Sequence, residues 1–141
     1  MAPTIVLGYD GSDGSQAALS TAVTVARAFA ARLTIVFGYE PNPMGGESSD
    51  YRHQLEALGQ GVVAQAFAAA RELDASLEIE QLVVPLRPAE SLLEAAIERQ
   101  ALVIVVGGSG ERPILGAILG SVPHKLLHRS TVPVLVVPTP E

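Results

Sequence analysis

The amino-acid sequence predicts an α/β domain with an open parallel sheet and helices on both faces. Short, continuous apolar runs alternate along the chain with longer segments whose apolar residues recur every three or four positions. Turns rich in Gly, Pro, Ser or Asp separate these segments. The composition is 48% hydrophobic but only 4% aromatic, so Val, Ile, Leu and Ala must form the core, as they do where helices cover a buried parallel sheet.

Size and charge limit the possible functions. A chain of 141 residues is long enough for one domain with its own core, and we expect a single domain over residues 1–141. The formal net charge of -6 disfavours nucleic acid as a partner. The absence of cysteine excludes disulfides and thiolate chemistry. We find no signal-peptide pattern and no apolar segment near the ~20 residues of a membrane span, so we expect a cytoplasmic protein without a membrane partner.

The first half of the chain predicts two strands and two helices. Residues 4–9 and 33–39 are short β-branched runs typical of buried strands. Between them, residues 15–31 form a predicted helix, with Ser12 or Asp13 placed to cap it. Its inward residues include Ala18, Ala22, Val25 and Phe29.

A Pro- and Gly-rich loop at residues 40–49 leads to a second predicted helix at residues 50–73. Apolar residues with helical spacing predict its inward face: Leu55, Leu58, Val62, Ala66, Ala69 and Leu73. A third strand at residues 76–84 alternates in polarity, which favours a place near the sheet edge. Pro88 then begins a third predicted helix through residue 100.

The last part of the chain predicts a fourth strand at residues 102–106, a short helix at residues 121–128 and a fifth strand at residues 131–137. Ser121 is the expected N-cap of that helix. Pro133 favours an edge position for the fifth strand, and an exposed apolar edge is best explained by pairing with a second copy.

Two glycine clusters follow the fourth predicted strand. Gly107-Gly108-Ser109-Gly110 is separated by nine residues from Gly120-Ser121. Glycine allows close approach of the backbone to a ligand, and a helix N-terminus directs N–H groups at an anion. The spacing therefore favours a phosphate site, although two ordinary strand-to-helix turns are the alternative.

The first strand offers a complementary group. In open α/β sheets the ligand binds beyond the carboxyl ends of the strands, where the strand order reverses. If the first and fourth strands flank this reversal, Asp10 can accept hydrogen bonds from a ribose while the glycines hold phosphates. Asp10 is equally suited to a helix cap or an Asx turn.

These motifs resemble the ATP-binding branch of the universal stress protein (UspA-like) family. Gly107, Gly110, Gly120 and Ser121 match the family pattern G-x-x-G-x9-G-[S/T], and the resemblance covers nearly the whole chain. It implies a Rossmann-like, adenine nucleotide α-hydrolase-like fold with strand order 3-2-1-4-5. It also implies a homodimer through the closing strand, Val132 to Val137.

The resemblance implies that Asp10 contacts the ribose, that the backbone near Gly38 reads the adenine edge and that the glycine clusters line the phosphates. The implied ligand is ATP, with AMP and cyclic AMP as alternatives and Mg2+ as an accompanying ion. The nucleotide-binding residues are then Gly8, Tyr9, Asp10, Gly38, Gly107, Gly108, Ser109, Gly110, Gly120, Ser121 and Val122.

Two departures from the family pattern affect the phosphate site. Many relatives carry a basic residue in the first glycine turn, where this chain has Ser109 followed by Glu111. Arg112 and Lys125 are the remaining nearby cations. The number of phosphates bound therefore stays open.

The sequence favours a stress-response sensor or regulator that is not an enzyme. It contains no P-loop, and the glycine segment offers no general base, so we expect at most slow, incidental ATP hydrolysis. A nucleotide-independent dimeric interaction module is the alternative, and an adenylating enzyme is less favoured because the loop is poor in cations. His53, His124 and His128 are expected on exposed helix faces, with no metal site and no catalytic residue.

Overall fold

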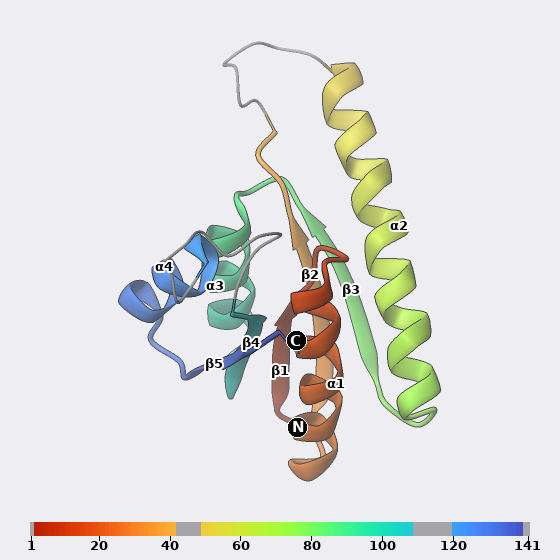
Figure 1. Ribbon diagram of the computed structural model, residues 1–141, viewed down its shortest axis with the longest axis vertical. Coiled ribbons are helices and arrows are strands. Elements are labelled where there is room, and N and C mark those ends of the chain that lie inside the picture. Colours follow the sequence, from red (N-terminus) through yellow and green to blue (C-terminus); the bar gives the residue numbers. More distant parts are fainter. Residues whose placement is uncertain (1, 42–48, 109–119, 140–141) are drawn as a thin grey trace.

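The computed structural model describes residues 2–41, 49–108 and 120–139. In this part of the chain a five-stranded parallel sheet is covered by α1 and α2 on one face and by α3 and α4 on the other (Figure 1). The elements are β1 (Thr4–Gly8), α1 (Asp13–Ala28), β2 (Arg32–Gly38), α2 (Ser49–Leu73), β3 (Ile79–Val84), α3 (Pro88–Arg99), β4 (Val103–Gly107), α4 (Ser121–Arg129) and β5 (Val134–Val137).

The strand order is β3-β2-β1-β4-β5, which confirms the predicted order. All pairs are parallel, and β1 lies between β2 and β4, with Ile5 opposite Leu33 on one side and Val103 on the other. The chain builds the sheet outward from β1 in one direction, then crosses back to build it in the other. The strand order therefore reverses between β1 and β4, as predicted.

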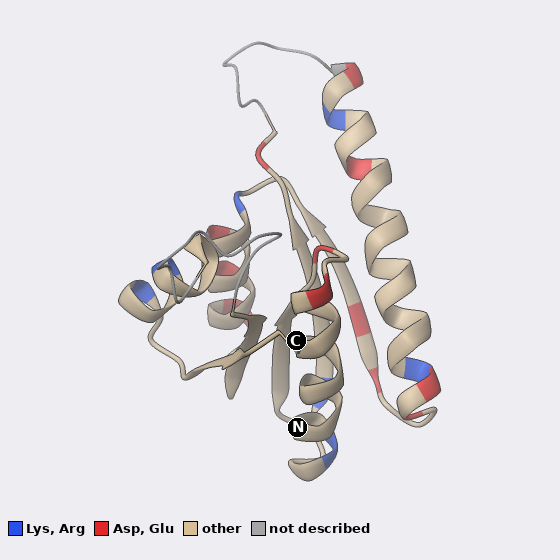
Figure 2. Cartoon of the chain, in the orientation of Figure 1, with Lys and Arg blue, Asp and Glu red and all other residues tan. Residues whose placement is uncertain are grey.

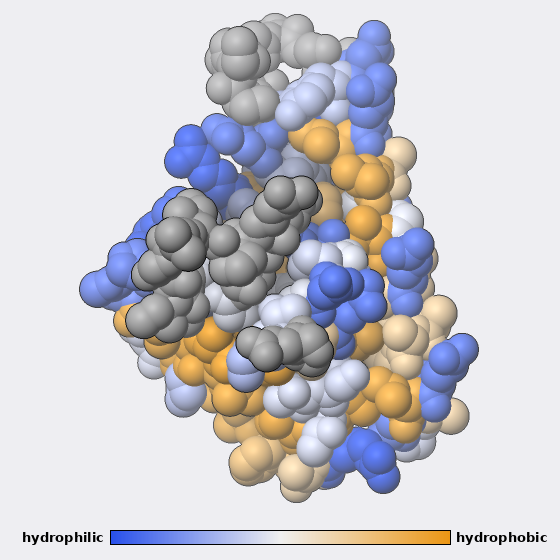
Figure 3. Space-filling view, viewed as in Figure 1, coloured by the Kyte–Doolittle hydropathy of each residue, from blue (hydrophilic) through white to orange (hydrophobic). Residues whose placement is uncertain are grey.

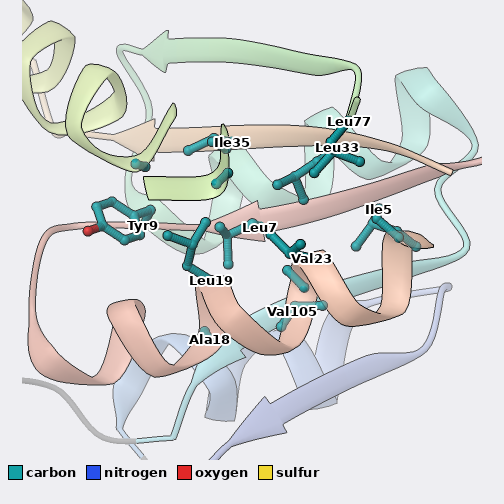
Figure 4. Packing of buried hydrophobic residues seen from close by; sticks show 14 of the residues in the cluster. Ile5, Leu7, Tyr9, Ala18, Leu19, Val23, Leu33, Ile35, Leu77 and Val105 are labelled. Atoms are coloured by element: carbon teal, nitrogen blue, oxygen red, sulfur yellow. The ribbon is translucent and has the colours of Figure 1, made fainter. Parts of the chain in front are cut away.

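Alternate residues of the central strands divide the core into two layers. Ile5 and Leu7 of β1 point toward α1, where Leu19 and Val23 pack on them (Figure 4). Val6 faces the opposite side and packs with the residues of α3. Since β1 is buried on both faces, its unbroken apolar run is explained.

The helix α1 begins as the sequence predicts. The Ser12 side chain caps it by accepting a hydrogen bond from the Ser15 N–H at 3.3 Å. In return, the Ser15 hydroxyl donates to the Ser12 carbonyl at 3.0 Å. These two bonds fix the first turn of α1 next to the end of β1.

The predicted cap of α4 is wrong. Gly120, not Ser121, is the N-cap, and no side chain caps this helix. Gly120 has extended backbone angles (φ -71°, ψ 173°), and its N–H donates to the Gly108 carbonyl at 2.8 Å. That bond fixes the turn one residue before Ser121, which becomes the first residue of the helix.

Some residues predicted to face the core are exposed. Phe29 is 60% exposed because α1 ends at Ala28 and the chain turns away through Ala30, whose φ is 51°. In α2, Leu58 and Leu73 are 56% and 49% exposed. The buried row of α2 is instead Gly59, Val63, Ala66 and Ala70.

Two strands are shorter than predicted. Asp74 accepts hydrogen bonds from both the N–H and the hydroxyl of Ser76 and so forms a turn after α2. The strand β3 therefore begins only at Ile79. Pro133 has no N–H to donate, and β5 begins only after it, at Val134. Both strands lie at the sheet edges, as predicted.

None of the helices in residues 2–41, 49–108 and 120–139 is long and apolar enough to cross a membrane.

Candidate functional site

A crevice opens beyond the carboxyl ends of β1, β2 and β4, at the reversal of strand order. Its walls come from these strand ends and from the first turns of α1, α3 and α4. The lining residues are Gly8, Tyr9, Asp10, Ser12, Ser15, Val36, Phe37, Gly38, Pro88, Ser91, Leu92, Val106, Gly107, Gly120, Val122 and Pro123.

Most of the predicted site residues meet in this crevice. Those that line it are Gly8, Tyr9, Asp10, Gly38, Gly107, Gly120 and Val122. Gly108, the next residue after Gly107, is buried and does not line the crevice. Ser121 is exposed and also lies outside the lining. Ser109 and Gly110, also predicted to bind the nucleotide, lie outside the described residues.

The two glycine clusters are joined by backbone hydrogen bonds. The Gly120 N–H donates to the Gly108 carbonyl at 2.8 Å, and the Gly108 N–H donates to the Val137 carbonyl at 2.8 Å. The end of β4, the start of α4 and the end of β5 are therefore tied together at one point. This arrangement places the N-terminus of α4 at the crevice wall, where it can face an anion.

Glycine is required by close packing at two lining positions. A Cβ on Gly107 would lie 2.7 Å from the carbonyl carbon and oxygen of Gly14 in α1. A Cβ on Gly8 would lie 2.9 Å from a methyl group of Leu92 in α3. The absence of side chains here brings the first turns of α1 and α3 close to the sheet, and so narrows the crevice.

Asp10 forms the Asx turn that the sequence allowed. Its Oδ1 accepts a hydrogen bond from the Ser12 N–H at 2.9 Å, and Gly11 between them has φ 87°, which favours glycine. Asp10 is nonetheless exposed and lines the crevice. Since a carboxylate can accept more than one hydrogen bond, the turn leaves Asp10 able to accept a further one from a ligand.

The backbone of Gly38 is directed toward the crevice by strand alternation. The Tyr39 N–H donates to Val84 in β3, and the Val36 carbonyl accepts from the Tyr9 N–H on the β1 side. In a parallel strand, alternate residues direct both N–H and C=O to the same neighbour. Gly38 therefore directs its N–H and C=O toward the β1 side, beyond the point where β1 ends.

The described wall of the crevice carries little charge. Asp10 is the one charged residue among its described lining residues. Burial, and then the negative charge of Asp10, raise the pKa of the neighbouring Tyr9, so this phenol stays neutral at physiological pH. Lys and Arg residues appear on α4 (Figure 2), where Lys125 and Arg129 lie beyond its first turn. The helix N-termini thus supply positive potential along the described wall.

An ion pair and a hydrogen bond hold the chain beyond β2. The Arg87 guanidinium lies 2.9 Å from the Glu40 carboxylate, which joins the start of α3 to the residues after β2. The phenol O–H of the buried Tyr39 donates a hydrogen bond to the Glu56 carboxylate of α2 at 3.2 Å. Burial, and to a lesser extent this hydrogen bond, raises the pKa of Tyr39. These contacts hold the backbone directly after Gly38.

The sequence did not indicate the contribution of α3. Pro88, Ser91 and Leu92 line the crevice from its first turn. The available signal was the position of Pro88, which begins a helix at the carboxyl end of the third strand. That signal places a helix N-terminus at the correct edge of the sheet, but it does not show which neighbouring strand the helix covers.

No group of three or more His, Asp or Glu side chains that could hold a metal ion occurs within residues 2–41, 49–108 and 120–139. His124 and His128 are exposed on α4, with ring centroids 4.6 Å apart.

The chain matches the model of the family described as "Universal stress protein family" over residues 1–138. A universal stress protein of Thermus aquaticus, described by its position in the QAH/OAS sulfhydrylase 3' region, is 36% identical over 142 residues. The alignment covers 97% of this chain and 99% of the relative.

Solved structures share the fold. A universal stress protein in complex with cAMP is 32% identical, with a TM-score of 0.70 and 98% of each chain covered. The hypothetical protein MJ0577 has a TM-score of 0.83 at 20% identity, with 100% of this chain and 99% of that chain covered; at this identity the likeness shows the fold alone.

Proposed function

Since this chain belongs to the universal stress protein family, we propose that it binds an adenine nucleotide in the crevice and acts as a stress-response sensor or regulator in the cytoplasm. One observation carries the proposal. The reversal of strand order brings Asp10, Gly38, Gly107 and Gly120 to the same crevice, although they are far apart in the sequence.

The geometry suits a nucleotide in one orientation. The phosphates lie at Gly107 and Gly120, where the N-terminus of α4 supplies positive potential. The ribose lies beside Asp10, whose carboxylate accepts from a hydroxyl group. The base then extends toward Gly38, whose N–H and C=O match the alternating acceptor and donor of the adenine edge. Ser109 and Gly110, which lie outside the described residues, are the other residues that we assign to phosphate binding on the sequence pattern.

Adenine is the favoured base, since a relative of 32% identity was crystallised with cAMP. ATP is the proposed physiological ligand, accompanied by Mg2+, with AMP and cyclic AMP as alternatives. Because Asp10 is the one charged side chain among the described lining residues, a triphosphate gains less from direct ion pairing here than in a site rich in Lys and Arg.

The bound nucleotide acts as a signal and is not consumed. The described lining residues present no His, Lys or Glu that could serve as a general base near the phosphate end. Hydrolysis of ATP is accordingly slow and incidental.

Equilibrium titration calorimetry with ATP, AMP, cyclic AMP and GTP, each with and without Mg2+, tests the proposal. We expect saturable binding of at least one adenine nucleotide and weaker binding of GTP. Asp10→Ala should weaken binding about tenfold, because a ligand hydroxyl loses a charged acceptor. Asp13→Ala is the matched control, since Asp13 lies three residues away in α1 but outside the lining. No saturable binding to any of the four nucleotides would overturn the proposal.

A second candidate is a nucleotide-independent interaction module. The observation that favours it is β5, an edge strand of four half-buried apolar residues that leaves one side of the sheet unpaired in the single chain. Figure 3 shows apolar surface over the region where β5 lies. Pairing of two chains through Val132 to Val137 would cover it. Sedimentation analysis of wild type and of Leu135→Lys, with and without ATP, separates the two candidates. A wild-type dimer that forms equally well without nucleotide and is lost in Leu135→Lys favours the second.

A further inference from the structure

Ser91 places a buried hydroxyl in the crevice wall directly above Gly38. Ser91 lies in the first turns of α3 and is 1% exposed, yet it lines the crevice. A Cβ built on Gly38 would overlap the Ser91 Oγ and would lie 2.8 Å from the Ser91 Cβ. The hydroxyl and the Gly38 backbone are therefore immediate neighbours.

The hydrogen of this hydroxyl is already engaged. Ser91 Oγ lies 2.7 Å from the Pro88 carbonyl oxygen. A carbonyl oxygen can only accept, so Ser91 must donate its single hydrogen to Pro88. Toward the crevice, the Oγ can act only as an acceptor, and its burial leaves little water to occupy the remaining lone pair.

The neighbouring wall makes this end of the crevice suitable for a base. Val36, Leu92 and Pro88 line the crevice together with Ser91 and are apolar. Gly38 ends β2 and Gly107 ends β4, on opposite sides of β1, so Ser91 and the N-terminus of α4 lie toward different ends of the crevice. A planar ring packs well against apolar side chains, while a phosphate needs the helix N-terminus. The base and Ser91 thus share one end of the site.

We propose that Ser91 is a specificity-determining residue that selects purines with a 6-amino group over purines with a 6-oxo group. This inference rests on the proposed nucleotide site. The Oγ accepts a hydrogen bond from the exocyclic amine, whose second hydrogen is left for the Gly38 carbonyl. A 6-oxo group would instead place an acceptor against an acceptor, with no hydrogen available between them.

Calorimetric titration with three monophosphates isolates this contact: AMP, purine riboside 5'-monophosphate, which lacks the amine, and IMP, which carries the oxo group. We expect wild type to bind AMP about threefold to tenfold more tightly than the riboside monophosphate, and IMP more weakly than AMP. In Ser91→Ala, AMP should lose about this factor, while binding of the riboside monophosphate changes less than about twofold. Ser20→Ala, an exposed serine of α1 outside the lining, is the matched control.

The outcomes separate this inference from the proposed function. Nucleotide binding by wild type together with an unchanged AMP preference in Ser91→Ala overturns the role of Ser91 and leaves the proposed function standing. Equal losses for all three ligands in a variant of normal thermal stability also overturn it, because they indicate a general packing role. If wild type binds none of the three and also fails to bind ATP, both the proposed function and this inference are overturned.

Discussion

The Gly120 N–H donates a hydrogen bond of 2.8 Å to the Gly108 carbonyl, and so joins the two glycine clusters across the segment between them. Gly108 is buried, and its own N–H is bonded to Val137. Gly108 and Gly120 are consequently held together at the end of β4, whatever ligand the crevice holds.

Removing this hydrogen bond should weaken both the fold and the site. Gly120 has φ -71°, which proline can adopt, so Gly120→Pro deletes the donor without forcing a new φ. We expect the free energy of unfolding to fall by about 1 kcal/mol and nucleotide affinity to fall with it. Gly120→Ala keeps the N–H and is the control. Equal stability of the two variants in urea titrations would show that the bond contributes nothing.

Gly107 should tolerate substitution less well than its neighbour. In Gly107→Ala the new Cβ would lie 2.7 Å from the backbone of Gly14, which cannot rotate away, and we expect a loss of about 1–3 kcal/mol. In Gly108→Ala the nearest atom is a methyl group of Val136 at 3.3 Å, which can adjust. Thermal unfolding of both variants checks the order, and a Gly108→Ala protein less stable than Gly107→Ala would contradict it.

The two glycines of α2 should respond in opposite directions to alanine. A Cβ on Gly59 would lie 2.7 Å from atoms of both Phe37 and Val83, so Gly59→Ala forces the helix away from the sheet and lowers stability. A Cβ on Gly61 meets nothing within 4 Å. Gly61→Ala should therefore raise the free energy of unfolding by about 1 kcal/mol, the difference in helix propensity. Urea unfolding measures both, and stabilisation by Gly59→Ala would refute this packing account.

The free energy of unfolding should depend on pH in the acid range, because the Glu80 carboxylate is bound by Arg99 and by the buried hydroxyl of Thr34. Arg99 contacts the Glu80 carboxylate at 2.7 and 2.8 Å, and Thr34 donates to it at 3.0 Å. The Arg99 hydrogen bond, with that of Thr34, lowers the pKa of Glu80 against the opposing effect of burial. The stabilisation is therefore complete above the ordinary pKa of Glu, about 4.3, and is lost as pH falls through the lowered value.

Glu80→Gln should accordingly destabilise the protein at pH 7, and the difference from wild type should shrink as pH falls below about 4. Because Glu80 is 43% exposed, solvent screening limits the effect to about 1 kcal/mol or less. Glu78→Gln is the matched control, since Glu78 is 70% exposed and lies 3.7 Å from Arg32. Chemical denaturation between pH 3 and pH 7, at ~1-unit steps, measures both; a pH-independent difference for Glu80→Gln would refute the assignment.

The order of the strands and the meeting of Asp10 with Gly107 and Gly120 could be predicted because they depend on few variables. Alternating strands and helices require parallel pairing, and the position of a turn after a strand fixes the edge at which it lies. The resemblance to a family then supplied the strand order. These features are insensitive to the detailed shape of side chains.

Side-chain detail could not be predicted in the same way. Helical spacing made Leu58 as good a core residue as Val63, and only the close approach at Gly59 decided which row of α2 faces the sheet. Ser91 gave no signal, because its role depends on the neighbouring Gly38 across a helix–sheet contact. Ser121 was a good cap by residue type, but the bond between Gly120 and Gly108 fixed the turn one residue earlier.

The pairing of β1 with both β2 and β4 also sets the order in which the molecule can be completed during synthesis. Ile5 meets Leu33 soon after the N-terminal part of the chain is made, but its other neighbour, Val103, follows much later. At ~5–20 residues per second, several seconds of translation separate the two events. The edge of β1 that pairs with β4 therefore stays open on the ribosome until β4 emerges, and the proposed nucleotide site can be assembled only when the chain is nearly complete.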